Sequence, residues 1–182
     1  MATLRQYPFF QKAYVVKDLQ AGVEHWNRLF NAGPFILVPH HKTDRFDYRG
    51  TQQEADVSYA FGYLGDMMIQ LIEQHDDTPS IYRDMYAAGQ DGFHHVGVLV
   101  HEFEAEFRRL ESLGFECATR LFADGVDAAY FDTRDAIGCF TEIHGDPPQI
   151  LSAFAGWHRA HELHQPGDPA TIPRPGLGVR RS

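Results

Sequence analysis

The chain has 182 residues, a length that suits one domain of ordinary size or two small modules that share a core. Hydrophobic residues make up 43% and aromatic residues 13% of the chain, which excludes an intrinsically disordered protein. The net charge of −9 argues against a broad nucleic-acid or anionic-membrane surface, and no apolar run approaches the roughly 20 residues of a membrane helix.

The N-terminal residues MATLRQYPFFQKAYVV lack the order of charged, apolar and cleavage regions that marks a signal peptide. The two cysteines, Cys117 and Cys139, are too few for a disulfide framework and have no zinc-binding spacing. By elimination, we expect a soluble cytoplasmic protein.

The first predicted unit occupies residues 7–74. It opens with a strand in QKAYVVKDL and continues into a helix in LQAGVEHWNRLF, where apolar residues recur at three- and four-residue steps. Gly33 follows the helix, where a C-terminal cap favours glycine. Three strands are expected next, in PFILVPH, EADVSYAFGYL and DMMIQLIEQ.

Residues 75–92 are expected to link this unit to the next, with one short helix that begins near Pro79 and Ser80. The stretch GFHHVGVLV then has the pattern of a strand. Its alternation places His95 and Gly97 on one face and valines on the other. A glycine beside a histidine leaves open space, so the face of His95 is expected to line a cavity.

The second predicted unit occupies residues 93–148 and repeats the order of the first. Its strand precedes an amphipathic helix in FEAEFRRLESLGF and three strands in FECATRLF, DAAYFDT and IGCFTEIHG. Residues 149–182 follow as a helix in ILSAFAGWHRAHELH and a Pro- and Gly-rich end, which is expected to be extended or loosely ordered.

The two units align as copies of each other. Gln11 falls on His95 in the first strands, and Gln70 falls on Glu142 in the last strands. Each copy therefore places two polar residues in apolar runs, which a plain core disfavours. The predicted fold class is α+β, with two tandem βαβββ modules in residues 1–148.

Each of these four residues also has an ordinary structural explanation. His95 could bond to backbone at a strand start, and Gln11 and Gln70 could be polar edge residues. The repeat alignment favours a shared site instead. Glu142 is the strongest candidate, because a carboxylate in an apolar strand needs a partner cation or a proton.

Other polar groups carry weaker signals. His94 is expected to face the opposite side of its strand and to be structural. The basic cluster in KTDRFDYRG favours a solvated loop over an anion-binding rim. On the C-terminal helix, His161 and His164 are three residues apart and are expected to have no metal role.

The duplicated arrangement resembles the vicinal oxygen chelate superfamily, which contains glyoxalases, bleomycin-resistance proteins and extradiol dioxygenases. The segments that show this resemblance lie within residues 7–150 and are QKAYVVKDLQAGVEHW, GPF, GDMMIQLIEQ, GFHHVGVLV and YFDTRDAIGCFTEIHG. The resemblance implies a cupped mixed sheet around a metal-binding cleft. Two modules resemble methylmalonyl-CoA epimerase and glyoxalase I more than the longer dioxygenases.

The family's metal ligands stand at the positions of Gln11, Gln70, His95 and Glu142. One divalent ion is implied, and the ligand types suit Zn, Co, Ni or Mn without selecting among them. Two glutamines depart from the pattern, because two neutral amides bind a dication more weakly than a set with two carboxylates.

The resemblance implies an isomerase or epimerase that stabilises an enolate of a small acyl thioester or 2-oxo compound. Glu142 would be both ligand and base, and Glu54 stands near the position of a second catalytic glutamate. A glyoxalase-like lyase and a metal-free binding module remain as alternatives. We expect a small-molecule substrate and no nucleic-acid or membrane partner, and a homodimer is left open.

Overall fold

A computed structural model describes residues 7–174, in which one mixed sheet of eleven strands is accompanied by five helices. The strands are β1 (Phe9–Val15), β2 (Phe35–Val38), β3 (Arg45–Tyr48), β4 (Thr51–Gln52), β5 (Val57–Leu64), β6 (Met67–Gln74), β7 (Gly92–Val100), β8 (Cys117–Ala123), β9 (Val126–Phe131), β10 (Phe140–Gly145) and β11 (Thr171–Ile172). The helices are α1 (Leu19–Phe30), α2 (Ile81–Met85), α3 (Phe103–Ser112), α4 (Arg134–Ile137) and α5 (Pro148–Leu163).

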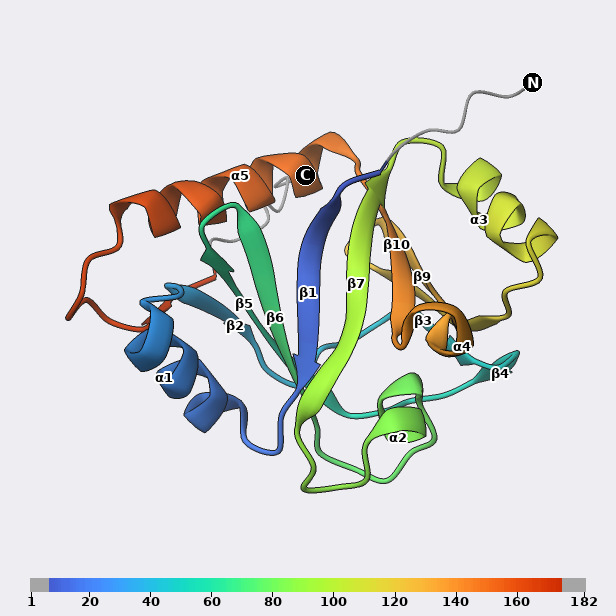
Figure 1. Ribbon diagram of the computed structural model, residues 1–182, viewed down its shortest axis with the longest axis horizontal. Coiled ribbons are helices and arrows are strands. Elements are labelled where there is room, and N and C mark those ends of the chain that lie inside the picture. Colours follow the sequence, from blue (N-terminus) through green and yellow to red (C-terminus); the bar gives the residue numbers. More distant parts are fainter. Residues whose placement is uncertain (1–6, 175–182) are drawn as a thin grey trace, which may run out of the picture.

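The sheet consists of two equivalent halves that meet at its centre. Its order is β11-β2-β5-β6-β1-β7-β10-β9-β8-β3-β4, and β1 and β7 pair antiparallel at the junction. Figure 1 shows this pair in the middle of a strongly curved sheet, with α1 and α3 to either side and α5 across one end. The predicted α+β class with two tandem modules is therefore confirmed; the boundaries of the modules stay a prediction.

The strand register agrees with the sequence alignment of the two copies. In the first half, β1 and β6 run parallel with Ala13 opposite Gln70, and in the second, β7 and β10 run parallel with Gly97 opposite Glu142. Across the junction, Gln11 lies opposite Gly97 and Ala13 opposite His95. Because side chains alternate along a strand, this register turns all four predicted site residues toward one face.

Each module buries its helix against the outer face of its own strands. The Asp18 side chain accepts a hydrogen bond from the backbone N–H of Ala21 and so caps α1. Leu19 and Val23 on this helix then pack with Leu71 of β6 in one apolar cluster. The inner face is not covered by α1 or α3, and this is the face that carries the site.

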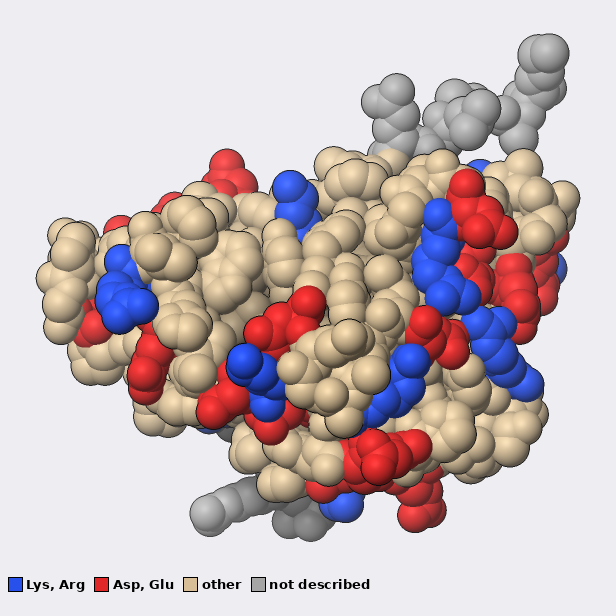
Figure 2. Space-filling view, turned by 60° about the horizontal axis from the view of Figure 1, so that its bottom comes forward, with Lys and Arg blue, Asp and Glu red and all other residues tan. Residues whose placement is uncertain are grey.

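Residues 45–52 form a β-hairpin, whereas the sequence favoured a solvated loop there. Strand β3 pairs antiparallel with β8, so a segment of the first module extends the sheet of the second. Behind the hairpin, Arg49 contacts three carboxylates, those of Asp84, Glu116 and Asp132. Figure 2 shows basic and acidic side chains lying side by side on one face, as such pairing produces.

Arg49→Ala is expected to lower the free energy of unfolding by about 1.5–3 kcal/mol, the usual range for hydrogen bonds to charged groups. Contacts from Arg134 first, and then from Arg49, hold the pKa of Asp132 at about 2. Stability from Asp132 is therefore present above its unfolded pKa and lost as pH falls through about 2.

Urea unfolding at pH 7 and near pH 2 measures both effects of Arg49→Ala, and the difference from wild type should shrink at the lower pH. Arg45→Ala is the matched control, since Arg45 pairs with Asp47 on the exposed side of the same hairpin. That change should cost less than about 1 kcal/mol. Equal losses in the two variants would contradict the structural role of Arg49.

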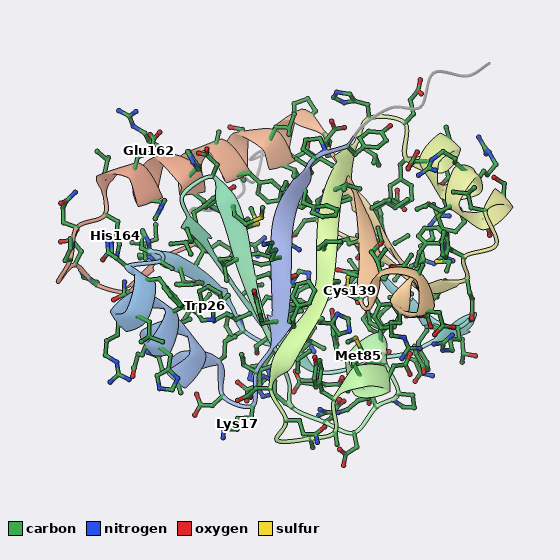
Figure 3. The ribbon with its side chains drawn as sticks, viewed as in Figure 1. Lys17, Trp26, Met85, Cys139, Glu162 and His164 are labelled. Carbon is green, nitrogen blue, oxygen red and sulfur yellow. The ribbon has the colours of Figure 1, made fainter. Side chains whose placement is uncertain are left out.

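The C-terminal segment beyond α5, for which the sequence predicts an extended or loosely ordered end, is extended at Thr171–Ile172 and packs against the first module. Strand β11 pairs parallel with β2, and residues 175–182 lie outside the described part. The side chain of His164, at the end of α5, lies 2.9 Å from the Asn27 amide of α1 (Figure 3). His161 lies 2.5 Å from the carbonyl oxygen of Gly33 and accepts from the Gly65 N–H. These contacts hold α5 against the sheet.

Within the described residues, no helix is both long enough and apolar enough to cross a membrane.

Candidate metal centre and pocket

The four predicted site residues lie together on the inner face of the sheet. Gln11 comes from β1, Gln70 from β6, His95 from β7 and Glu142 from β10, and each is at most 4% exposed. These are the four central strands of the sheet, two from each module. The structure thus brings together residues that are up to 131 positions apart in the sequence.

Three acceptor atoms surround the side-chain nitrogen of Gln11. This Nε2 donates to Gln70 Oε1 and to Glu142 Oε2, both at 2.9 Å, and lies 3.3 Å from His95 Nε2. An amide nitrogen has only two hydrogens, so it cannot serve all three acceptors fully. The convergence of these atoms on one point is the arrangement that a cation satisfies better than an amide.

A chain of hydrogen bonds fixes the tautomer of His95. His94 Nε2 lies 3.0 Å from the carbonyl oxygen of Ile81, which can only accept, so this nitrogen carries a hydrogen. Burial lowers the pKa of His94 to about 3, which keeps its ring neutral. His94 Nδ1 must then accept from His95 Nδ1, 2.9 Å away. The remaining nitrogen of His95, Nε2, faces the centre.

Glu142 lies beside this nitrogen and is held by further hydrogen bonds. Its Oε1 accepts from the Tyr130 hydroxyl at 2.9 Å, and its Oε2 lies 3.4 Å from His95 Nε2. Burial raises the pKa of Glu142, but positive charge at its Oε2 side, together with the hydrogen bond from the Tyr130 hydroxyl, outweighs burial and holds the pKa below its usual value. The carboxyl is therefore ionised at neutral pH.

Gly97 provides the space that the carboxylate occupies. A Cβ atom built at this position would lie 2.9 Å from Glu142 Oε2, 2.9 Å from the Phe10 ring and 3.2 Å from the Gln11 Cβ. Any larger residue would therefore displace one of the site residues. The glycine that follows His95 thus makes room for Glu142, as well as for the cavity.

A cavity of about 110 Å³ is lined by three of the four residues. Gln11, Gln70 and Glu142 lie at its polar floor, and its walls are mainly apolar. The apolar and aromatic lining comes from both modules and from α5: Val38, Tyr59, Phe61, Leu121, Ala123, Val126, Ala128, Tyr130, Ile150, Phe154 and Trp157. A concave apolar pocket over a few converging polar groups has the form of a small-molecule site.

The donor set fits a divalent cation. Gln70 Oε1, His95 Nε2 and Glu142 Oε2 already face one point, and a half-turn of the Gln11 amide would bring its oxygen toward that point as a fourth ligand. The described residues contain no cluster of three or more His, Cys, Asp and Glu side chains that could hold a metal. Any metal here depends on the two glutamine amides.

Glu54, the expected second base, lies away from this site. It is exposed in the segment between β4 and β5 and does not line the cavity. Pairing of the β3–β4 hairpin with β8 fixes the start of this segment at the far edge of the sheet. His144 lines the cavity instead, two residues after Glu142 on β10, and its Nδ1 lies 2.6 Å from the carbonyl oxygen of Gly145. Strand alternation could have identified it.

His94 was expected to be structural only, but its position predicts an effect on metal affinity. His94→Phe removes the acceptor for His95 Nδ1 and preserves stacking on Phe140, whose ring centroid lies 5.0 Å away. Loss of a group that orients a metal-binding histidine typically costs 10–100-fold in affinity. We expect a loss of that order in a Co²⁺ titration.

Tyr82→Phe is the control for His94→Phe. It removes a hydroxyl from a ring that packs on His94 at 5.1 Å, and leaves the hydrogen bonds from Ile81 to His95 in place. Its Co²⁺ affinity should stay within a few-fold of wild type. Unchanged affinity in His94→Phe would show that His94 does not orient His95.

The comparisons with known proteins bear on the family and the fold. The sequence profile of the Glyoxalase/Bleomycin resistance protein/Dioxygenase superfamily matches residues 10–131. No curated protein matches the chain.

Solved structures give the same fold at low sequence identity. Methylmalonyl-CoA epimerase from Mycobacterium tuberculosis superposes with a TM-score of 0.60 at 19% identity, covering 84% of this chain and 97% of its own. A hypothetical protein from Bacillus halodurans C-125 gives 0.59 at 16%, with 79% and 96% covered. A methylmalonyl-CoA epimerase variant from Streptomyces coelicolor, in complex with 2-nitronate-propionyl-CoA, gives 0.56 at 16%, with 79% and 97% covered. The chain belongs to the Glyoxalase/Bleomycin resistance protein/Dioxygenase superfamily.

Proposed function

We propose that this protein is a divalent-metal-dependent enzyme that moves a proton at the carbon next to a carbonyl group, as an isomerase or epimerase does. The observation that carries the proposal is the convergence of Gln11, Gln70, His95 and Glu142 on one point at the floor of an apolar cavity. The likeness to methylmalonyl-CoA epimerases supports it through the fold.

The chain's own residues would divide the chemistry among them. Gln11, Gln70, His95 and Glu142 would hold the metal ion, which supplies Lewis-acid stabilisation of the negative charge on the carbonyl oxygen. Glu142, ionised at neutral pH, accepts the proton from carbon and returns it. Tyr130 fixes the carboxylate through Oε1, and the apolar walls keep bulk water from the reacting carbon.

A second proton-transfer group is needed if the reaction inverts a carbon centre. His144 is the candidate within the described residues, because it lines the cavity near Glu142. Its Nδ1–H donates to the Gly145 carbonyl, which leaves Nε2 with a lone pair. If the reaction inverts a carbon centre, we therefore assign the second proton transfer to His144, the role for which the sequence suggested Glu54. A glyoxalase-like lyase would use the same proton transfer and differ in its product.

A metal-free binding module is the second candidate function. One observation favours it: the Gln11 amide already bonds two of the three converging acceptors, so the site is largely satisfied without an ion. The apolar cavity would then sequester a hydrophobic small molecule.

Two measurements separate these functions. Elemental analysis of protein purified without chelators tests for a bound metal. NMR in deuterated water then tests whether 2-oxo compounds and acyl thioesters exchange their α-hydrogens. Metal together with exchange supports the enzyme. A metal-free protein that binds apolar ligands without exchange would refute it in favour of the binding module.

A further inference from the structure

The C-terminal segment forms one wall of the cavity. Residues 148–174 follow both modules, and Ile150, Phe154 and Trp157 of α5 face the cavity. Trp157 stacks on Phe61 of β5, with ring centroids 5.6 Å apart, and Phe154 stacks on Phe10 of β1 at 5.7 Å. These contacts tie the wall to the sheet and present aromatic surface to a ligand.

The end of the described segment also lines the cavity. Beyond β11, which extends the sheet at β2, Arg174 donates to Asp124 at 2.7 Å. Asp124 lies in the turn between β8 and β9 of the second module. The ion pair therefore joins the two halves of the molecule above the site, and both partners line the cavity.

The charges of the cavity wall disfavour a ligand with an anionic tail. Among the described lining residues, Arg174 is the one lysine or arginine, and Asp124 already neutralises it. Burial is the main cause that lowers the pKa of His41. The charge of Asp124 raises this pKa and the charge of Arg174 lowers it, and the net shift is downward. The imidazole of His41 therefore stays neutral at neutral pH. A buried carboxylate without a counter-ion is costly.

The size of the cavity also bears on the tail. An apolar protein cavity of roughly 150 Å³ holds one benzene molecule. The cavity of about 110 Å³ here is comparable, and it suits an apolar group of about the size of a small ring.

We infer that the substrate is a small carbonyl compound with an uncharged apolar tail, either aromatic or branched aliphatic, and that the C-terminal segment selects this tail. The carbonyl end faces Gln11, Gln70 and Glu142, and the tail lies between Phe61, Phe154 and Trp157 and the aliphatic wall of the second module. The placement of the carbonyl end rests on the proposed function. The selected tail lacks the second carboxylate of a methylmalonyl group.

Two 2-oxo acids with the same reacting end and different tails test this inference. 4-Methyl-2-oxopentanoate has a branched apolar tail, and 2-oxoglutarate ends in a carboxylate. Their binding can be followed by the fluorescence of Trp157 in a Trp26→Phe background, since Trp26 packs on Tyr14 at α1 and does not line the cavity (Figure 3). Each probe is titrated with and without added Zn²⁺.

The apolar probe is expected to bind at least about tenfold more tightly than 2-oxoglutarate. Asp124→Asn releases Arg174 and should improve 2-oxoglutarate binding by roughly two- to fivefold, as expected for an exposed ion pair. Arg174→Gln added to this variant should cancel the gain. Asp124 is partly exposed in a turn, so the substitution leaves the fold in place.

The inference would be overturned if the protein with Asp124 intact bound 2-oxoglutarate as tightly as 4-methyl-2-oxopentanoate, or more tightly. It would also be overturned if neither probe bound. Failure of Asp124→Asn to change the preference would overturn the role of the charge pair. A tenfold preference for 4-methyl-2-oxopentanoate without α-hydrogen exchange would support the selection of an apolar tail and refute the proposed enzymatic function. The failure of one proposal is therefore distinguishable from the failure of the other.

Discussion

Glu142→Gln is expected to abolish α-hydrogen exchange, with a loss of at least about 100-fold and up to about 10⁴-fold. Glutamine keeps the shape of the side chain and removes both its charge and its basicity. Glu142 is 3% exposed, and bulk water cannot readily replace it as the base. The measurement is the rate of deuterium incorporation into a 2-oxo substrate by NMR.

Glu54→Gln is the matched control, because it makes the same chemical change in an exposed segment outside the cavity. Its exchange rate and metal content should equal those of wild type. Exchange at the wild-type rate in Glu142→Gln would show that another group, with His144 the nearest candidate, removes the proton.

The sequence was sufficient to predict the four converging residues because they follow from an internal repeat. Two copies of one module pair in the same internal register, so an alignment of the copies also aligns positions in space. Gln11 and His95 occupy such equivalent positions, with Met68 opposite the first and Phe140 opposite the second. Strand alternation then settles which face they share.

Features that depend on contacts between different parts of the chain could not be predicted in this way. No periodicity indicates that a hairpin of the first module will pair with β8 of the second, and this pairing moves Glu54 away from the site. Likewise, the apolar residues of α5 predict a helix but not the surface that it covers. The role of His94 depends on the carbonyl of Ile81, which the linker brings beneath it.

His95→Ala and Glu142→Ala are each expected to empty the metal site, because they remove the one imidazole and the one charge that face its centre. Gln11→Ala and Gln70→Ala should weaken binding less, since each removes a neutral amide. Gln11→Ala should have the smallest effect, because it also removes the amide that bonds the other ligands when no cation is present. Elemental analysis after dialysis against Zn²⁺ gives the order.

Thermal unfolding provides an independent measure of the same binding. A ligand at 100 times its Kd stabilises the folded state by about 2.7 kcal/mol, so a chelator should lower the stability of the Zn²⁺-loaded wild type by about that amount. The His95→Ala protein should show no such loss, because it has no metal to release. Gln70→Ala should keep part of the increment and serves as the folded control. Full metal occupancy in Glu142→Ala would contradict the assignment of these four residues as the ligands.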